Sequence, residues 1–240
     1  MAIDLTNRYA TSVYMRGGVT AWTNNRTLNP VSRGMIHHTA GWYLKKLGAN
    51  ASEKEETAEI DAIARDHFNR FGIGPGYYYF AFPSGRLYAV GKWGTHRAHT
   101  KWFDPDTRKY HNRIGIAICA VGNYEDDKPT KQMLAAIESG IREVEGFAGR
   151  RLPWTGHGRT PSVDASGNPV NQGTLCPGKH LLSWLDSYLE SRDRPAEIRP
   201  KPLGLTDVSA WTQAWQRGSE NPRYEGEFER HEIVIPRRKG

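Results

Sequence analysis

The sequence predicts an α/β fold, in which a central mixed β-sheet is flanked by α-helices. Three segments have apolar residues at helical spacing, and short apolar or aromatic segments with strand character alternate with them. Strands interleaved with long helices favour a layered structure with helices on the faces of a sheet. We expect a single folded domain over residues 1–190, whose first 30 residues are loop or extended structure, and a C-terminal extension over 191–240.

A short strand at Met35–Ile36 is followed by the clearest helix of the chain. Residues 52–71 are predicted to be helical because apolar and aromatic side chains recur there at three- and four-residue steps. Ser52 and Glu55 have the spacing of a capping box at the start of this helix, and Gly72 is placed to end it.

The middle of the chain is predicted to form a hairpin, a buried strand and a second helix. Tyr77–Phe82 and Arg86–Val90 are strand-like segments joined by a Pro-Ser-Gly turn. Residues 114–121 are apolar enough for a buried strand. A helix is expected over about 130–148, with Thr130 as its N-cap.

The last part of the domain is predicted to contain a tight turn at Thr155–Gly156 and a third helix. This helix is expected to start near Pro177, because proline fits a first helical turn and apolar residues follow at helical spacing. In the extension, Arg, Pro and Glu become frequent, which indicates a linker or a loosely packed tail. A short helix at Thr206–Trp215 and a strand at His231–Ile235 are expected within it.

Composition excludes several classes of protein. Two cysteines in 240 residues exclude a disulfide-rich module, and no apolar run approaches the length of a membrane span, so we expect no stable membrane insertion. Asp4 and Arg8 occupy positions where a signal peptide needs an apolar stretch, so synthesis in the cytoplasm is expected. The net charge of +7 fits an anionic partner. A nucleic acid is not expected, because no zinc-finger spacing or recognised DNA-binding motif accompanies the charge.

Three residues of metal-ligand type occur in predicted rigid surroundings. His37 follows a strand, His157 follows the predicted turn, and Cys176 precedes Pro177 at the predicted helix entrance, where the helix dipole would favour a thiolate. Catalytic zinc sites take about three protein ligands and leave a further position for water. The spacing alone is weak support, because the three residues come from separate segments of a chain with nine histidines.

Several short motifs follow one another along residues 30–190. They are Ile36-His37-His38-Thr39-Ala40, Gly76-Tyr77-Tyr78-Tyr79-Phe80, Arg97-Ala98-His99-Thr100, Asn112 before Ile114-Gly115-Ile116, Val121-Gly122-Asn123-Tyr124, Gly156-His157 and Thr174-Leu175-Cys176-Pro177-Gly178. In this order the motifs resemble the type-2 N-acetylmuramoyl-L-alanine amidase family, which includes phage endolysins and peptidoglycan recognition proteins.

The resemblance implies that residues 1–190 are a zinc amidase domain acting on bacterial peptidoglycan. His37, His157 and Cys176 match the three zinc ligands of the family. Tyr77 matches a tyrosine that hydrogen-bonds the zinc-bound water, and Thr174 takes the place of a residue near the developing oxyanion. Five further residues are candidate substrate-binding residues: His38, for which packing or support of a neighbouring ligand is the favoured interpretation, Trp42, His99, Trp102 and Asn112.

The chain departs from the family pattern in two loops. His157 and Cys176 are 19 residues apart, more than in many members, with a Gly-, Pro- and Asn-containing loop over 160–173 between them. Residues 102–111 are also longer than usual. A longer loop changes little if its ends stay in place, so both ligands are retained in the prediction.

The expected reaction is hydrolysis of the amide between N-acetylmuramic acid and L-alanine by an endolysin that leaves the host cytoplasm at lysis. One alternative is a recognition protein that binds peptidoglycan without cleaving it, although such members typically lack the cysteine ligand. Another is a recycling amidase for anhydro-muropeptides. Those enzymes resemble this family but have Glu and Asp where this chain has Ala117 and Cys176.

Overall fold

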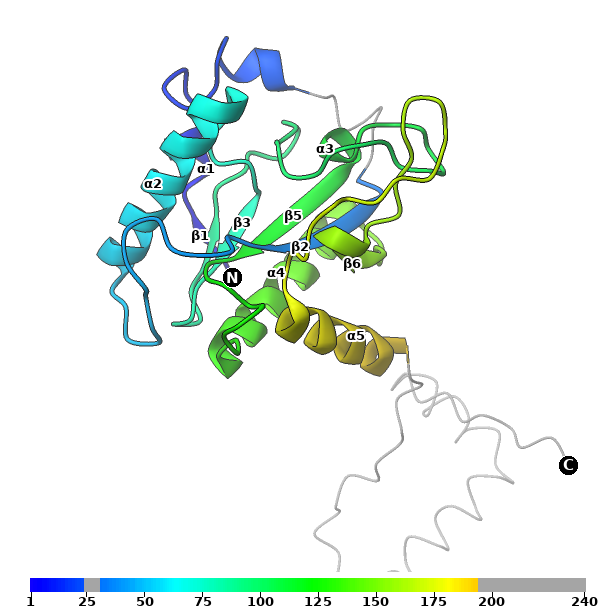
Figure 1. Ribbon diagram of the computed structural model, residues 1–240. Helices are drawn as coiled ribbons and strands as arrows, with labels where there is room; N and C mark the ends of the chain where they lie inside the picture. Colours follow the sequence, from blue (N-terminus) through cyan, green and yellow to red (C-terminus); the bar gives the residue numbers. More distant parts are fainter. Residues whose placement is uncertain (24–30, 194–240) are drawn as a thin grey trace, which may run out of the picture. The chain divides into compact units, whose positions relative to one another are not determined.

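The computed structural model describes residues 1–23 and 31–193 (Figure 1). These residues contain a six-stranded mixed sheet with the order β1-β4-β3-β5-β2-β6. The hairpin strands β3 and β4 are antiparallel, and the other neighbouring pairs are parallel. The strands are β1 (Ile3–Asp4), β2 (Arg33–His38), β3 (Tyr79–Ala81), β4 (Leu87–Ala89), β5 (Gly115–Ala120) and β6 (Trp154–Gly156). The predicted α/β fold with a central mixed sheet is confirmed.

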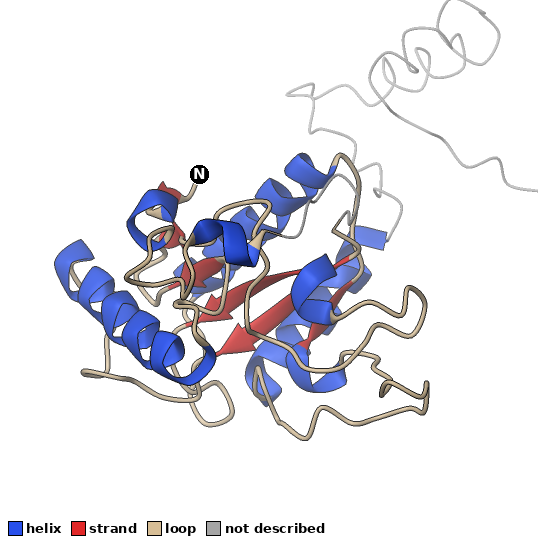
Figure 2. Ribbon diagram, turned by 90° about the horizontal axis from the view of Figure 1, so that it is seen from above, coloured by secondary structure: helices blue, strands red, loops and turns tan. Residues whose placement is uncertain are grey.

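Helices lie on both faces of this sheet (Figure 2). Side chains of α4 and α5 share one apolar cluster with one face, and side chains of α2 share a second cluster with the other. The helical segments are α1 (Thr6–Tyr9), α2 (Glu53–Phe71), α3 (His111–Ile114), α4 (Lys131–Ala148) and α5 (Lys179–Asp193), with two 3₁₀ turns, η1 (Val19–Trp22) and η2 (His157–Arg159).

The two longest helices begin and end where their sequences predict. The Ser52 side chain accepts from the Glu55 N–H and the Glu55 side chain accepts from the Ser52 N–H, which completes the capping box of α2. Gly72 ends the helix in the left-handed conformation, with φ 79°. Thr130 caps α4 by accepting from the Met133 N–H at 3.1 Å.

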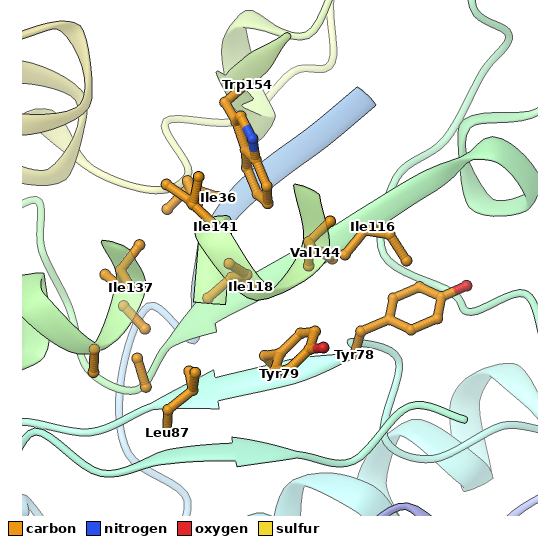
Figure 3. Close-up of a cluster of buried hydrophobic side chains, with 14 of the residues drawn as sticks. Ile36, Tyr78, Tyr79, Leu87, Ile116, Ile118, Ile137, Ile141, Val144 and Trp154 are labelled. Atoms are coloured by element: carbon orange, nitrogen blue, oxygen red, sulfur yellow. The ribbon is translucent and has the colours of Figure 1, made fainter. Parts of the chain in front are cut away.

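The larger core lies between the sheet and α4 (Figure 3). Ile137 and Ile141 of α4 share this cluster with Ile118 of β5, and all three are fully buried. At the sheet edge, the Trp154 ring lies against Gly34, where an added Cβ would come within 2.3 Å of the ring. Gly34 therefore lets β6 pair closely with β2, which matters because both strands lead into the candidate site.

Three predicted boundaries differ from the structure. The first 30 residues, expected to be loop or extended, include β1, α1 and η1, and β1 adds an edge strand beside β4. The predicted turn at Thr155–Gly156 belongs to β6, which pairs with β2. The third helix starts at Lys179, so Pro177 precedes it. The short strands and helices of two to four residues span only about one period of a hydrophobic pattern, so periodicity cannot reveal them.

The helix predicted at Thr206–Trp215 and the strand predicted at His231–Ile235 lie outside the described residues. The same holds for most of the predicted extension over 191–240, which stays a prediction. Among the helices that the structure describes, none is both long enough and apolar enough to cross a lipid bilayer.

Candidate metal centre

The pairing of β2 with β6 brings His37 and His157 together. Successive side chains of a strand point to opposite faces, so Ile36 faces the α4 core and His37 faces the other side. Ile36 pairs with Gly156 in the parallel register, and His157 directly follows Gly156. Neighbouring strands lie about 4.8 Å apart, and the two imidazole centroids are accordingly 4.5 Å apart.

Cys176 reaches the same place from the segment that precedes α5. The Cys176 carbonyl accepts from the Gly158 N–H at 2.7 Å, and its Sγ accepts from the His38 backbone N–H at 3.3 Å. Sγ is 3.7 Å from Nδ1 of His37. One ligand atom from each of His37, His157 and Cys176 lies within 4.8 Å of the others, so the structure brings the three predicted metal ligands together.

Gly158 allows this close approach. An added Cβ at Gly158 would lie 2.2 Å from the backbone oxygen of Thr174 and 3.1 Å from that of Cys176. The backbone that carries His157 is thus in direct contact with the backbone that carries Cys176.

Burial sets the protonation states of the metal-free ligands. It lowers the pKa of His37 well below its usual value, with a further contribution from His157, and it lowers the pKa of His157 to about 4. Burial raises the pKa of the Cys176 thiol to about 12, against the opposing effect of the His38 N–H. Cys176 precedes the helix entrance at which it was predicted, because α5 starts at Lys179, and in the metal-free protein burial dominates the pKa of its thiol.

Tyr77 lies beside the three ligands. Its ring centroid is 5.1 Å from that of His37 and 5.4 Å from that of His67, which projects from α2. His67 Nδ1 accepts from the Gly76 N–H at 3.0 Å, which fixes the backbone just before Tyr77. Burial first, and then the nearby thiols of Cys119 and Cys176, raise the pKa of Tyr77 well above its usual value. The phenol therefore stays protonated, and its side chain is hydrogen-bonded to Cys119 in the metal-free protein.

Thr174 lies two residues before Cys176, in the same segment. Its Oγ1 accepts from the Cys176 N–H at 3.1 Å. This bond uses a lone pair and not the hydroxyl proton, so Thr174 keeps the capacity to donate.

The candidate substrate-binding residues take different positions. The His99 ring lies 5.5 Å from that of His37, near the ligands. The His38 ring accepts from the Tyr124 N–H at 3.1 Å, and Trp42 packs against the core on the α2 side. Trp102 is 37% exposed in the 102–111 loop. None of these contacts tests a role in substrate binding, which stays a prediction.

Asn112 has a structural use that its prediction did not include. Its Oδ1 accepts from the backbone N–H groups of both His99 and Thr100, at 2.8 and 2.9 Å. The side-chain oxygen is therefore engaged within the protein, and a role of Asn112 in substrate binding stays a prediction.

The two long loops are joined to each other. Phe103 and Val163 exchange backbone hydrogen bonds of 3.0 and 2.9 Å. In the same region His111 Nε2 lies 3.0 Å from Ser162 Oγ, which also accepts from Gln172 Nε2 at 2.5 Å. The 160–173 loop is thus tied to the 102–111 loop on one side of the site, as the ribbon also shows (Figure 1).

Three residues near the ligands were not among the predicted site residues. They are His67, which supports Tyr77, Gln172, whose side chain hydrogen-bonds His157, and Thr100, whose hydroxyl faces His37. The helical stripe containing His67 indicated packing, and Gln172 and Thr100 lie in loops whose paths no local pattern sets.

Comparisons with known proteins agree with this architecture. The model of the family described as N-acetylmuramoyl-L-alanine amidase matches residues 27–179. A peptidoglycan-recognition protein of Drosophila melanogaster is 26% identical over 170 residues, which make up 71% of this chain and 81% of that protein.

Two solved structures share the fold. PGRP-SA of Apis mellifera has a TM-score of 0.56 and 21% identity, covering 78% of this chain and 96% of that chain. The endolysin amidase LysCS of Clostridium intestinale has a TM-score of 0.53 and 16% identity, covering 79% of this chain and 95% of that chain.

Proposed function

The chain belongs to the N-acetylmuramoyl-L-alanine amidase family, and from that premise we propose that it is a zinc-dependent peptidoglycan hydrolase. The substrate bond is the amide between N-acetylmuramic acid and the L-alanine of the stem peptide. The observation that carries the proposal is the convergence of His37, His157 and Cys176, with ligand atoms within 4.8 Å of one another.

The three side chains fit zinc in chemistry and in spacing. Two imidazoles and a thiolate are zinc ligands, and burial keeps both imidazoles neutral, the form that binds metal. A nitrogen at about 2.1 Å and a sulfur at about 2.3 Å from one tetrahedral zinc lie about 3.6 Å apart. The separation between His37 Nδ1 and Cys176 Sγ is 3.7 Å.

When bound, zinc supplies a Lewis acid for the amide carbonyl and lowers the pKa of water to about 7. The remaining tasks belong to side chains. Tyr77, held protonated, donates a hydrogen bond that orients the attacking water. Thr174 donates its hydroxyl proton toward the oxygen that gains negative charge, a contact that contributes about 3 kcal/mol in other enzymes.

We propose further that the protein acts as a phage or prophage endolysin, made in the host cytoplasm and reaching the wall on release at lysis. The net charge of +7 supports this proposal, because it favours adsorption to an anionic wall. The structural similarity to an endolysin amidase of Clostridium intestinale is consistent with it.

The test compares the wild-type chain with Cys176→Ser. Zinc content is measured after dialysis, and hydrolysis is followed as the fall in turbidity of purified cell walls together with the release of free L-alanine N-termini. We expect the substitution to abolish zinc binding and hydrolysis together, because a serine hydroxyl is a poor zinc ligand. Retention of wall hydrolysis by this variant would refute the proposed site.

Two further assays on the wild-type chain, sedimentation with cell walls and cleavage of soluble anhydro-muropeptides, separate the alternatives. A peptidoglycan recognition protein without activity would sediment with cell walls without releasing N-termini. A recycling amidase would cleave soluble anhydro-muropeptides in preference to intact walls. The cysteine at position 176 favours hydrolysis over recognition without cleavage, because it completes the metal-ligand set. It favours wall hydrolysis over recycling for a different reason, because the recycling enzymes have Asp at this position.

A further inference from the structure

The His37 ring has a different neighbour at each nitrogen. Nδ1 lies 3.7 Å from Cys176 Sγ, whereas Nε2 lies 3.5 Å from Thr100 Oγ1. The two nitrogens of an imidazole point in different directions, so a metal held at Nδ1 leaves an N–H at Nε2. Metal-binding histidines almost always donate this second N–H to an acceptor, which fixes the ring orientation and the tautomer.

We propose that Thr100 is a positioning residue that accepts this hydrogen bond and so orients His37 as a metal ligand. The inference rests on the proposed zinc site. At 3.5 Å the contact is at the outer limit of a hydrogen bond, and we expect it to shorten once Nδ1 is fixed by a metal. Thr100 is 3% exposed, so water does not compete readily for this place.

The other contacts of the Thr100 hydroxyl leave a lone pair on Oγ1 that can accept a hydrogen bond from His37. Its Oγ1 is 2.9 Å from Nδ1 of His99 and 3.2 Å from the sulfur of Met35. Thr100 donates to the Met35 sulfur as the structure stands, but an imidazole nitrogen is the stronger acceptor, so in the tautomer of His99 with an unprotonated Nδ1 the hydroxyl proton goes to His99. In this arrangement the His37 N–H donates to Thr100 Oγ1, and the Thr100 hydroxyl donates to His99 Nδ1. His99 thereby helps to orient the Thr100 hydroxyl.

Asn112 holds the backbone that carries Thr100. Its Oδ1 accepts from the N–H groups of His99 and Thr100 at 2.8 and 2.9 Å, which joins this segment to α3. These two hydrogen bonds to one amide oxygen thus hold the backbone of Thr100 in place, and with it the position of the hydroxyl beside the His37 ring. A role in packing alone would need neither the hydroxyl nor this arrangement.

The test uses the full chain and measures zinc affinity by competition with a chromogenic chelator. Thr100→Val keeps the branched shape and removes the hydroxyl, and we expect its zinc affinity to fall about 10- to 100-fold. Thr100→Ser keeps the hydroxyl and should restore most of the affinity. Thr107→Val is the matched control: its hydroxyl bonds Asp104 within the same loop and faces no ligand, so zinc affinity should not change.

A spectroscopic readout separates orientation from packing. In the cobalt-substituted protein, the ligand-field bands report the geometry of the ligands, and we expect them to shift in Thr100→Val but not in Thr107→Val. Wild-type affinity and an unchanged cobalt spectrum in Thr100→Val would overturn the inference.

Folding of each metal-free variant is checked by circular dichroism and thermal unfolding. If Thr100→Val does not fold, the pair Asn112→Asp and Asn112→Leu replaces it. The Asn112→Asp variant keeps an acceptor for both backbone N–H groups, so its zinc affinity should stay near that of the wild type. The Asn112→Leu variant loses the acceptor, so its zinc affinity should fall. Equal zinc affinity in both would overturn the inference. Wild-type zinc binding by Cys176→Ser refutes the zinc site itself, whereas zinc loss in Cys176→Ser with full affinity in Thr100→Val refutes only the role of Thr100.

Discussion

Substitution of Gly158 by alanine should disable the metal centre without touching a ligand. Gly158 follows His157 directly, and its N–H donates to the Cys176 carbonyl at 2.7 Å. A Cβ at this position would lie 2.2 Å from the Thr174 carbonyl oxygen, a backbone atom that cannot rotate away. The clash therefore falls between the two segments that hold His157 and Cys176.

The required displacement follows from this distance. Real Cβ contacts are essentially never closer than 3.0 Å, so the segments must separate by about 0.8 Å. Zinc tolerates deviations of about 0.2 Å in its ligand distances, and a misplacement of about 1 Å can reduce catalysis by about 100-fold. We expect Gly158→Ala to bind zinc much more weakly and to lose about 100-fold in kcat/KM on cell walls.

Chelator competition and a turbidity assay on purified walls measure both effects. Gly146→Ala is the control, because nothing lies within 4 Å of the added Cβ and the residue lies within α4. Alanine favours a helix over glycine by about 1 kcal/mol, so this variant should unfold at a higher temperature and bind zinc as the wild type does. If Gly158→Ala bound zinc with wild-type affinity and kept wild-type activity, the argument from backbone contact would be refuted.

Two further predictions concern protonation and the phenol. Between pH 6 and 8 the metal-free His157, with a pKa of about 4, is neutral and the Cys176 thiol, with a pKa of about 12, is protonated. Near pH 6, where a zinc-bound water with a pKa of about 7 is still largely protonated, zinc binding should therefore release one proton from Cys176, and zinc affinity should rise about tenfold per pH unit. Calorimetry in buffers of different ionisation enthalpy measures the release, and zinc uptake without it would contradict these states. Tyr77→Phe should keep zinc but lower kcat by about 100-fold or more, because it removes only the donor. A wild-type rate in this variant would exclude Tyr77 from the reaction.

Much of the helical structure was predictable because its signals are local. The capping box of Ser52 and Glu55, Gly72 at the end of α2, and Thr130 before α4 lie within a few residues of the boundaries they set. The strands β1 and β6 were missed for the opposite reason. Each has only two or three residues, and it is the pairing with a distant strand that makes each one a strand.

The site depends on the same distant pairings. His37 and His157 meet because Ile36 pairs with Gly156, and no pattern around either histidine indicates that register. Motif resemblance supplied the ligands, but it could not indicate that the Asn112 amide serves the backbone at His99 and Thr100. It also could not show that burial keeps the Cys176 thiol protonated, since that depends on the packing of separate segments.

The three predicted metal ligands are divided unequally over the fold. His37 lies near the end of β2 and His157 directly follows β6, so the register of the sheet holds both, whereas Cys176 comes from a connecting segment outside the sheet. A shift of that connecting segment would therefore move the thiol relative to both histidines without changing the pairing of the strands.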